Sequence, residues 1–408
     1  MMAFDFSNSF GSRAGATENR WGGYPPYHFV GGNIDEDSVP VEELVAAVGN
    51  VLRADGHSMA KYGMEPGSLG HPPLRQFIVD NLKRRADMDV SIDDALITNG
   101  SLQAMNLVND ALLDKGDVVV LEEANYGGAL SRFDRLGVEY IGVKLDAGGM
   151  CMDHLREVMG DLKKQGRRPK FIYTIPTVQN PTGTIMSRER RLEMLDIARD
   201  FDTPIFEDDC YADLAWGQDR PPAIYALDTE DRVIYCGTFS KTVAPALRVG
   251  YLVAPWNVMQ HVLPFKLDAG CGALEQMVLA EYLTAHFDDH VEQLLPLLKT
   301  KSDAMVDALS EYFGASAEFT PPIGGIFIWV TLPENVDTQK LAAAAGAQGI
   351  AINPGPDWTV YGDDNKHRMR LCFGHAGVDN IREGVAKLAD ICHKEFGVPV
   401  RSGNIERG

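Results

Sequence analysis

One lysine of the chain lies among small hydroxyl residues directly after an apolar run. Lys241 belongs to the stretch 237–251, which reads GTFSKTVAPALRVGY, follows the apolar residues 233–235 and also contains Arg248. A lysine amine that is held in a site can act as a nucleophile and as a base. Most lysines and arginines are solvated surface residues, however, so this fragment alone does not establish a site. The chemistry of Lys241 depends on what other parts of the chain bring to it.

Polar residues follow several predicted strands at the point where each strand ends. Ligands of open α/β sheets bind outside the carboxyl ends of the strands, so these residues are candidates for one shared site. Ser101 starts a predicted helix, where free N–H groups and a hydroxyl make an anion site, although N-capping is the commoner use of such a serine. The ring of Tyr126 could lie flat against a ligand at the edge of the sheet, or Tyr126 could be an ordinary loop residue. The candidate segments are 98–104 (TNGSLQA), 122–128 (EEANYGG), 180–183 (NPTG) and 207–211 (EDDCY).

Other residue types bear on the kind of ligand. The carboxylates of 207–209 suggest a metal at first sight, but no histidine lies at metal-ligand spacing and no calcium-loop pattern occurs, so we expect no metal. The chain has no G-x-x-x-x-G-K-[ST] pattern, so a nucleoside triphosphate is not the expected anion. Arg370 lies in a predicted strand, where its planar fork can grip a carboxylate with two hydrogen bonds.

The elements that must position these residues alternate between short β-rich runs and helical runs. This alternation is typical of a parallel α/β sheet with helices on both faces. The predicted strands are 95–98, 118–121, 140–143, 171–174, 205–206, 233–235 and 248–253. The predicted helices of this part are 41–51, 73–85, 101–113, 130–136, 152–162 and 187–201.

A long helical pattern over 288–312 is predicted to connect this part to a C-terminal α+β part. That second part has predicted strands at 325–330 and 368–373 and predicted helices at 338–345 and 378–395. We therefore expect an N-terminal arm that includes part of the small domain (1–45), a large domain (46–290), and a small domain that begins within the connecting helix (291–408).

The composition limits the classes of function. The chain has 408 residues, 45% hydrophobic and 24% charged, which is typical of a globular protein with a substantial core. Its formal net charge of -20 repels phosphate backbones, so we expect small-molecule partners and no nucleic acid. Six cysteines without a C-x-x-C pair indicate reduced thiols, and no apolar run reaches the roughly 20 residues of a membrane span. We expect a cytoplasmic protein with no membrane contact.

The motifs N-P-T-G, D-x-x-Y, S-K-x-x-x-x-x-x-R and R-L-x-F occur in this order along the chain. Together they resemble the fold type I pyridoxal-phosphate enzymes, in particular the class I/II aminotransferases, and the resemblance covers nearly the whole chain. The most similar branch is that of the 2-aminoadipate, kynurenine and aromatic aminotransferases, which also has an irregular arm before a glycine element, here Gly31-Gly32. The resemblance implies a large domain with a mostly parallel seven-stranded sheet, a smaller α+β domain, and pyridoxal 5'-phosphate as the cofactor.

The implied activity is ping-pong transfer of the amino group of an L-amino acid to a 2-oxo acid, with 2-oxoglutarate as the expected acceptor. By resemblance, Lys241 is the Schiff-base lysine, which also moves the proton between the substrate Cα and the cofactor. Asp208 would pair with the pyridinium nitrogen and keep it protonated, so that the ring can absorb electrons. Tyr211 and Asn180 would hydrogen-bond the phenolic oxygen, and Tyr126 would stack on the ring.

The resemblance assigns the remaining candidates to the phosphate and to the substrate. Arg370 would clamp the substrate α-carboxylate, with Gly32 and Asn180 close by. Tyr62 resembles the tyrosine that reaches the phosphate of the neighbouring subunit, which implies a homodimer with active sites at its interface. The phosphate would be held by the backbone N–H groups of Ser101 and Leu102, the hydroxyls of Thr238 and Ser240, the charge of Arg248, and Tyr62.

The residues leave three questions open: the type of reaction, a possible role in regulation, and the substrate side chain. A lyase or an oxidase on the same scaffold would use the same Asp208 and Lys241, because all of these reactions begin with Cα deprotonation. An effector-binding module of a transcription regulator is a further alternative, disfavoured by the acidic charge. The substrate side chain is not specified; Arg20, with Arg13 and Trp21 of the arm, is a candidate contact for it, and packing or surface roles fit these residues as well.

Overall fold

The computed structural model describes residues 4–11, 14, 20–63, 67–217 and 219–399. Its largest sheet has seven strands in the order β2-β10-β9-β8-β7-β3-β4. All neighbouring pairs are parallel except those of β10, which runs antiparallel to β2 and β9. The strands are β2 (Ala95–Thr98), β3 (Val118–Glu122), β4 (Glu139–Val143), β7 (Ile172–Thr174), β8 (Ile205–Asp208), β9 (Val233–Thr238) and β10 (Gly250–Val253). The predicted mostly parallel α/β sheet is confirmed.

Helices cover both faces of this sheet because successive strand residues point to opposite sides. On β3, Val119 and Leu121 pack with α3 (Ser101–Leu112), α4 (Gly127–Leu136) and α8 (Trp256–Val262), whereas Val118 and Val120 pack with α5 (Met152–Lys164), α6 (Arg188–Asp200) and α7 (Ile224–Leu227). A third cluster joins α1 (Val41–Asp55) and α2 (Pro72–Ala86) to the first half of α9. The short strands β5 (Leu145–Asp146) and β6 (Gly149–Met150) form a separate hairpin.

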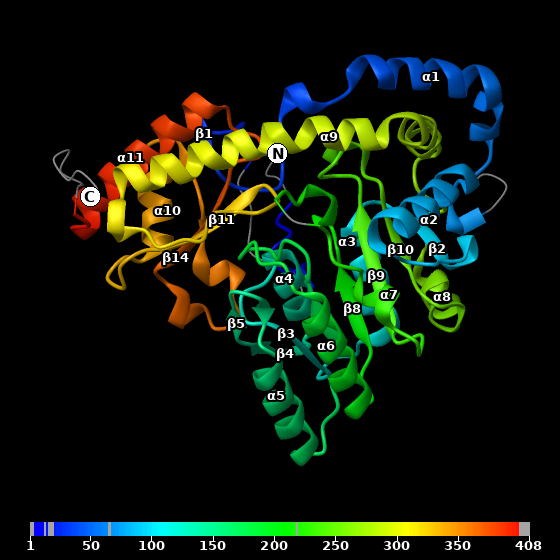
Figure 1. Cartoon of the computed structure of the whole chain (residues 1–408), viewed down its shortest axis with the longest axis horizontal. Helices are drawn as coiled ribbons and strands as arrows, with labels where there is room; N and C mark the ends of the chain where they lie inside the picture. Colours follow the sequence, from blue (N-terminus) through cyan, green and yellow to red (C-terminus); the bar gives the residue numbers. More distant parts are fainter. Residues whose placement is uncertain (1–3, 12–13, 15–19, 64–66, 218, 400–408) are drawn as a thin grey trace.

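A single helix, α9 (Ala273–Tyr312), runs along one side of the molecule from the large sheet to a smaller one (Figure 1). The sequence pattern placed its start near residue 288, and the structure corrects this by fifteen residues. The first turns of α9 are buried nearly all round, including Met277, Val278, Leu279, Ala280 and Leu283, so they show no one-sided helical periodicity.

The smaller unit contains the sheet β11-β14-β13, built from β11 (Phe327–Thr331), β13 (Asn353–Pro354) and β14 (Arg368–Cys372). Helices α10 (Thr338–Gly346) and α11 (Val378–Phe396) pack on it around a core that includes the C-terminal half of α9. The N-terminal arm joins this unit, since β1 (Tyr27–His28) pairs in parallel with β12 (Ile350–Ala351). The boundary predicted near residue 290 falls inside α9 and stays a prediction.

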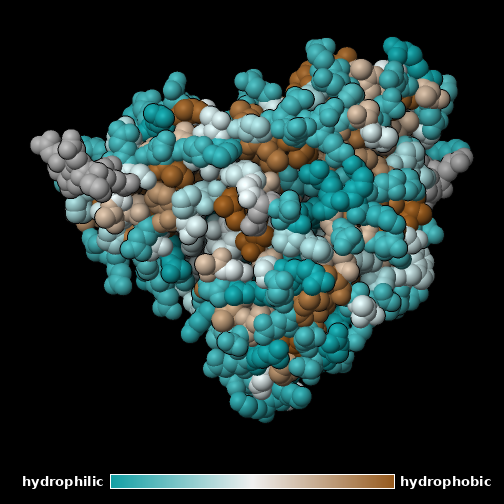
Figure 2. Space-filling view, viewed as in Figure 1, coloured by the Kyte–Doolittle hydropathy of each residue, from teal (hydrophilic) through white to brown (hydrophobic). Residues whose placement is uncertain are grey.

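Polar groups cover most of the face seen in Figure 2, with smaller hydrophobic patches along α9. Within the described part of the chain, no helix combines the length and apolarity that crossing a bilayer requires.

Candidate active site

A cavity of about 260 Å³ opens at the carboxyl ends of the large sheet, where the arm and the smaller unit meet it. Every candidate residue from the sequence lines this cavity except Tyr62 and Arg20. The lining residues are Gly31, Gly32, Ser101, Leu102, Tyr126, Ile175, Asn180, Asp208, Cys210, Tyr211, Thr238, Ser240, Lys241, Pro245, Arg248, Asn353, Trp358 and Arg370. The parallel sheet brings them together because Asp208 and Thr238 are the last residues of the neighbouring strands β8 and β9.

Lys241 follows the end of β9 and extends into the cavity. Its Nζ donates a hydrogen bond to the carbonyl oxygen of Gly32 at 2.8 Å. A Cβ on Gly32 would lie 2.3 Å from this Nζ, so a larger residue there would displace the amine from its present position. Burial lowers the pKa of Lys241, and the charges of Arg370 and Arg248 act in the same direction. The unprotonated amine, which is the nucleophilic form, is therefore favoured more than in a surface lysine.

Asp208 presents one free carboxylate oxygen. Its Oδ2 accepts a hydrogen bond from the hydroxyl of Tyr173 at 2.7 Å, while its buried Oδ1 has no partner among the described residues. Burial raises the pKa of Asp208, and hydrogen bonds from Cys210 and Tyr173 lower it in part. A buried acceptor without a partner is costly, so this oxygen fits a donor on a bound molecule, such as a protonated ring nitrogen.

A second buried oxygen in the cavity also lacks a partner. Asn180 Oδ1 has no hydrogen-bond partner among the described residues. Nearby, Tyr211 packs edge-on against Phe327 with ring centroids 5.1 Å apart, and burial raises its pKa. Tyr126 lies 5.9 Å from Trp358 by ring centroids. An amide, a phenol and a flat tyrosine ring around one space suit an aromatic ligand with polar substituents.

One end of the cavity is suited to an anion. Helix α3 begins at Ser101 after Gly100, whose φ of 75° favours glycine, so the first N–H groups of the helix have no intrahelical partner. Arg248 lies beside this turn and donates from Nη2 to the carbonyl oxygen of Asn99 at 3.0 Å. The Thr238 hydroxyl donates to Ser240 Oγ at 2.9 Å. Ser101 does not cap the helix, because Gly100 holds the cap position. The helix dipole, hydroxyls and guanidinium together fit a phosphate.

Arg370 lies at the opposite side of the cavity, on β14. Its guanidinium is stacked between the rings of Phe327 and Trp358, 4.5 Å and 4.4 Å from their centroids. Its Nη1 donates to the carbonyl oxygen of Gly31 and to Asn353 Oδ1, each at 3.1 Å, and its Nε has no partner among the described residues. These contacts fix the plane of the fork while leaving donors for a carboxylate.

Two candidates lie away from the cavity. Tyr62 is 93% exposed, and Arg20 is exposed in the arm, as is Trp21. Arg13 lies outside the described residues. The roles predicted for Tyr62 and Arg20 stay predictions.

Sequence reasoning missed several residues of the cavity. Gly31 and Cys210 are sequence neighbours of the predicted site residues Gly32 and Tyr211, and this adjacency could have identified them. Asn353 and Trp358 come from a C-terminal segment without motif or periodicity, and only the folded chain brings them to Arg370. Tyr173, the partner of Asp208, reads as an ordinary core residue of a buried strand.

Asp208, Cys210 and Cys236 have ligand atoms within 4.8 Å of one another, the arrangement that a metal ion needs. A hydrogen bond with Cys210 and burial raise the pKa of Cys236, and burial raises that of Cys210. Thiols that remain protonated are poor ligands, so we assign no metal to this group.

Known proteins resemble the chain over nearly its whole length. The family model of aminotransferase class I and II matches residues 32–388. An aromatic-amino-acid aminotransferase of Thermococcus litoralis is 34% identical over 90% of this chain and 88% of its own length. The α-aminoadipate aminotransferase of Thermus thermophilus, solved with N-(5'-phosphopyridoxyl)-L-leucine, has a TM-score of 0.86 and 30% identity, covering 96% of this chain and 99% of its own.

A helix-turn-helix-type transcriptional regulator of Bacillus subtilis is also similar, with 31% identity over 89% of this chain and 73% of its own length. The family match, the aminotransferase relatives and the fit of the cavity agree on the cofactor and on the class of reaction. The chain belongs to the aminotransferase class I and II family and is a transaminase that uses pyridoxal 5'-phosphate.

Proposed function

We propose that the cavity is the active site and that Lys241 is its reacting residue, moving the amino group of an L-amino acid to a 2-oxo acid, with 2-oxoglutarate as acceptor. The observation that carries the proposal is the convergence of a lysine with a lowered pKa, an aspartate with a free buried oxygen, and an aromatic-stacked arginine on one cavity. Transamination needs an aldehyde that takes up an amino group and an electron-poor ring, and pyridoxal phosphate supplies both.

Lys241 has two tasks in this proposal. Its amine would hold the aldehyde end of the cofactor. When not engaged there, Nζ would move the proton of the substrate Cα, acting first as general base and then as general acid. The hydrogen bond to the Gly32 carbonyl keeps Nζ at the cavity wall.

The other residues of the sheet side bind and orient the cofactor. Asp208, held in place by Tyr173, would accept from the protonated ring nitrogen through its free Oδ1. Asn180 and Tyr211 would contact the phenolic oxygen, and Tyr126 would cover the ring. The phosphate would be held by groups at and beside the start of α3, those of Ser101, Leu102, Thr238, Ser240 and Arg248.

Arg370 binds the α-carboxylate of the substrate, since its fork is already oriented by Gly31 and Asn353. This contact is common to every 2-amino acid and 2-oxo acid, so it serves both halves of the reaction. Gly32 and Asn180 complete the substrate side near the amine.

We further propose a homodimer. Helix α1 exposes Val41, Val45 and Leu52 along one face, and Tyr62 and Leu267 are 93% and 88% exposed beyond it. Large exposed apolar side chains that cluster in this way are typical of interaction sites. A second copy on this face would cover them and bring its Tyr62 to the phosphate. We place the protein in the cytoplasm, where its six free cysteines stay reduced.

Lys241→Ala tests the proposal, with Lys340→Ala as the control because the Lys340 side chain is 78% exposed on α10. We expect the first variant to lose at least about a thousandfold in amino-donor conversion and the second to keep wild-type activity. Near wild-type conversion by Lys241→Ala would refute the assignment. Product analysis with one amino acid, with and without an oxo acid, separates transfer from a lyase or oxidase, because only transfer needs the acceptor.

The regulator relative supports one alternative role, that of an effector-binding module. Retention on DNA that weakens with salt would favour it, whereas amino transfer at a rate independent of DNA favours the enzyme.

A further inference from the structure

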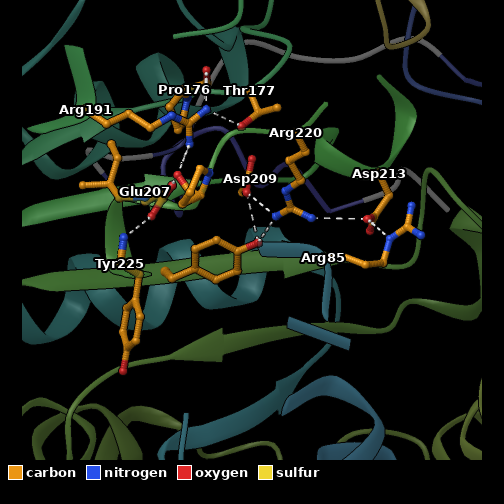
Figure 3. A network of polar contacts seen from close by, with 12 residues as sticks. Arg85, Pro176, Thr177, Arg191, Glu207, Asp209, Asp213, Arg220 and Tyr225 are labelled. Carbon is orange, nitrogen blue, oxygen red and sulfur yellow. Dashed lines mark hydrogen bonds and ion pairs between the residues drawn. The ribbon is translucent and has the colours of Figure 1, made fainter. Parts of the chain in front are cut away.

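Strand β8 ends in two carboxylates, Glu207 and Asp208, and a third, Asp209, follows directly. Asp208 lines the cavity, whereas its two neighbours point to polar networks outside it (Figure 3). Glu207 accepts from the backbone N–H groups of Ile224 and Tyr225, each at 2.9 Å, and lies 3.7 Å from Arg191. Each flanking carboxylate thus has its own cation or donors. Asp208 and Asp209 each keep an Oδ1 without a partner among the described residues, and of the two only Asp208 lines the cavity.

Arg220 is the cation that serves Asp209. Its Nη2 lies 2.6 Å from Asp209 Oδ2 and 3.1 Å from the Tyr235 hydroxyl, and its Nη1 lies 3.2 Å from Asp213. The side chain of Asp209 is fully buried and that of Arg220 is 11% exposed. Figure 3 shows Arg220 between the two aspartates, with Arg85 of α2 beyond Asp213. A buried charge pair of this kind is weakly screened by solvent, so its balance acts on neighbouring groups.

We propose that Arg220 is a positioning residue for the transamination, because it neutralises Asp209 and leaves Asp208 as the carboxylate whose charge acts on the cavity. The proposal rests on the role given to Asp208 above. Burial and, to a lesser extent, the charge of Asp209 raise the pKa of Asp208, so loss of Arg220 would strengthen proton binding by Asp208 and by the bound ring system next to it.

The proposal predicts opposite changes of proton affinity in the cavity for the two single variants, which a purely structural role of Arg220 would not produce. Arg220→Met leaves the negative charge of Asp209 unbalanced and raises proton affinity in the cavity. Asp209→Asn removes a negative charge next to Asp208 while Arg220 stays, and so lowers the proton affinity in the cavity. The double variant has neither charge, so proton affinity returns towards the wild-type value. The charged and titratable groups around this pair, which stay unchanged in all three variants, are Arg85, Tyr173, Arg191, Glu207, Asp208, Cys210, Asp213, Tyr235, Cys236 and Tyr251.

The test is a pH titration of the absorbance of bound pyridoxal phosphate, without turnover. A unit charge across the width of one strand moves the midpoint by roughly one pH unit, a tenfold change in proton affinity. We expect a higher midpoint for Arg220→Met, a lower one for Asp209→Asn, and a near wild-type one for the double variant. Shifts of one sign in both single variants, or none in either, would overturn the proposal.

Two further measurements keep the test decisive. If Arg220→Met does not fold, Asp209→Asn serves as the test by itself, because its Arg220 still has Asp213 as a partner. This variant must then lower the midpoint, and an unchanged midpoint overturns the proposal. Asp208→Asn separates this inference from the site assignment. If that variant keeps the wild-type midpoint and cofactor retention, the role of Asp208 is wrong. If it responds and the Arg220 and Asp209 variants do not, only the role of Arg220 is wrong.

Discussion

The two sides of the cavity are built differently. The sheet side takes Asp208 and Thr238 from adjacent strands of one sheet, and each has a hydrogen-bond partner on that side, Tyr173 and Ser240. The opposite side takes Gly31 from the arm and Arg370 from the smaller unit, which reach the cavity from segments more than 300 residues apart. The arm is tied to that unit by a short strand pair, while its preceding residues Trp21 and Tyr24 are exposed.

This difference separates two properties of the enzyme. In the proposed assignment, the groups that hold the cofactor belong to the sheet, whose geometry does not depend on which amino acid arrives. On the opposite side, Arg370 is proposed to bind the α-carboxylate that all substrates share, and the arm carries the candidates for contact with the substrate side chain. Changes on the sheet side should therefore reduce all reactions alike, changes at Arg370 should depend on the α-carboxylate, and changes in the arm should depend on the side chain.

Among the substitutions that compare the two sides, Asp208→Asn is expected to have the largest effect. The amide keeps the shape and can still contact Tyr173, but it removes the charge that holds the ring nitrogen protonated. We expect kcat to fall by about 10²- to 10³-fold, the usual loss when one preorganised electrostatic contact is removed. Single-turnover rates with an acidic and an aromatic donor measure it. A loss that differs between these donors would contradict the division between the two sides.

Arg370→Lys is expected to have the next largest effect. Lysine keeps the charge but loses the planar fork and the stacking on Phe327 and Trp358. We expect kcat/KM for 2-amino acids to fall by about 2–3 kcal/mol of transition-state binding, which is roughly 30- to 150-fold. An amine donor that lacks the α-carboxylate is the matched control. If that donor loses as much, Arg370 does not act through the carboxylate.

The sheet side was predictable from the sequence because its signals are local. Strand β2 has the predicted bounds, and Lys241, Asp208 and Asn180 each belong to a short motif that follows a strand. A parallel sheet collects such positions at one edge whatever the loops between them do. Spacing along the chain therefore made these residues candidates for one site, and the order of the motifs, through the family resemblance, gave them their expected roles.

The other side could not be predicted in the same way. Trp358 and Asn353 lie in irregular segments, and nothing in their spacing to Arg370 shows that they contact it. Their placement follows from long-range pairing of β11, β13 and β14. The start of α9 was misplaced for a related reason, since burial all round removes the periodicity on which helix prediction depends.

The lowered pKa of Lys241 makes the sheet side a source of instability in the cofactor-free protein. The unfolded chain binds this proton more tightly than the native protein, so the cost is complete below the native pKa and disappears as pH rises to about 10.4, the ordinary lysine value. Lys241→Met should therefore raise the Tm of the cofactor-free protein, most at neutral pH and least above about pH 10. Differential scanning calorimetry across this range checks it, and a gain that grows with pH would show the opposite sign.

Arg20→Ala is expected to have the smallest effect and gives the most selective test of the arm. Arg20 is exposed in the structure, and exposed ion pairs contribute about 0.2–1 kcal/mol, so acidic donors should lose at most about fivefold in kcat/KM while apolar donors stay unchanged. Trp21→Ala, at the neighbouring exposed position, controls for general disturbance of the arm. An equal loss for acidic and apolar donors would reject a role of Arg20 in substrate choice, and selection would then belong to the residues around Arg370 alone.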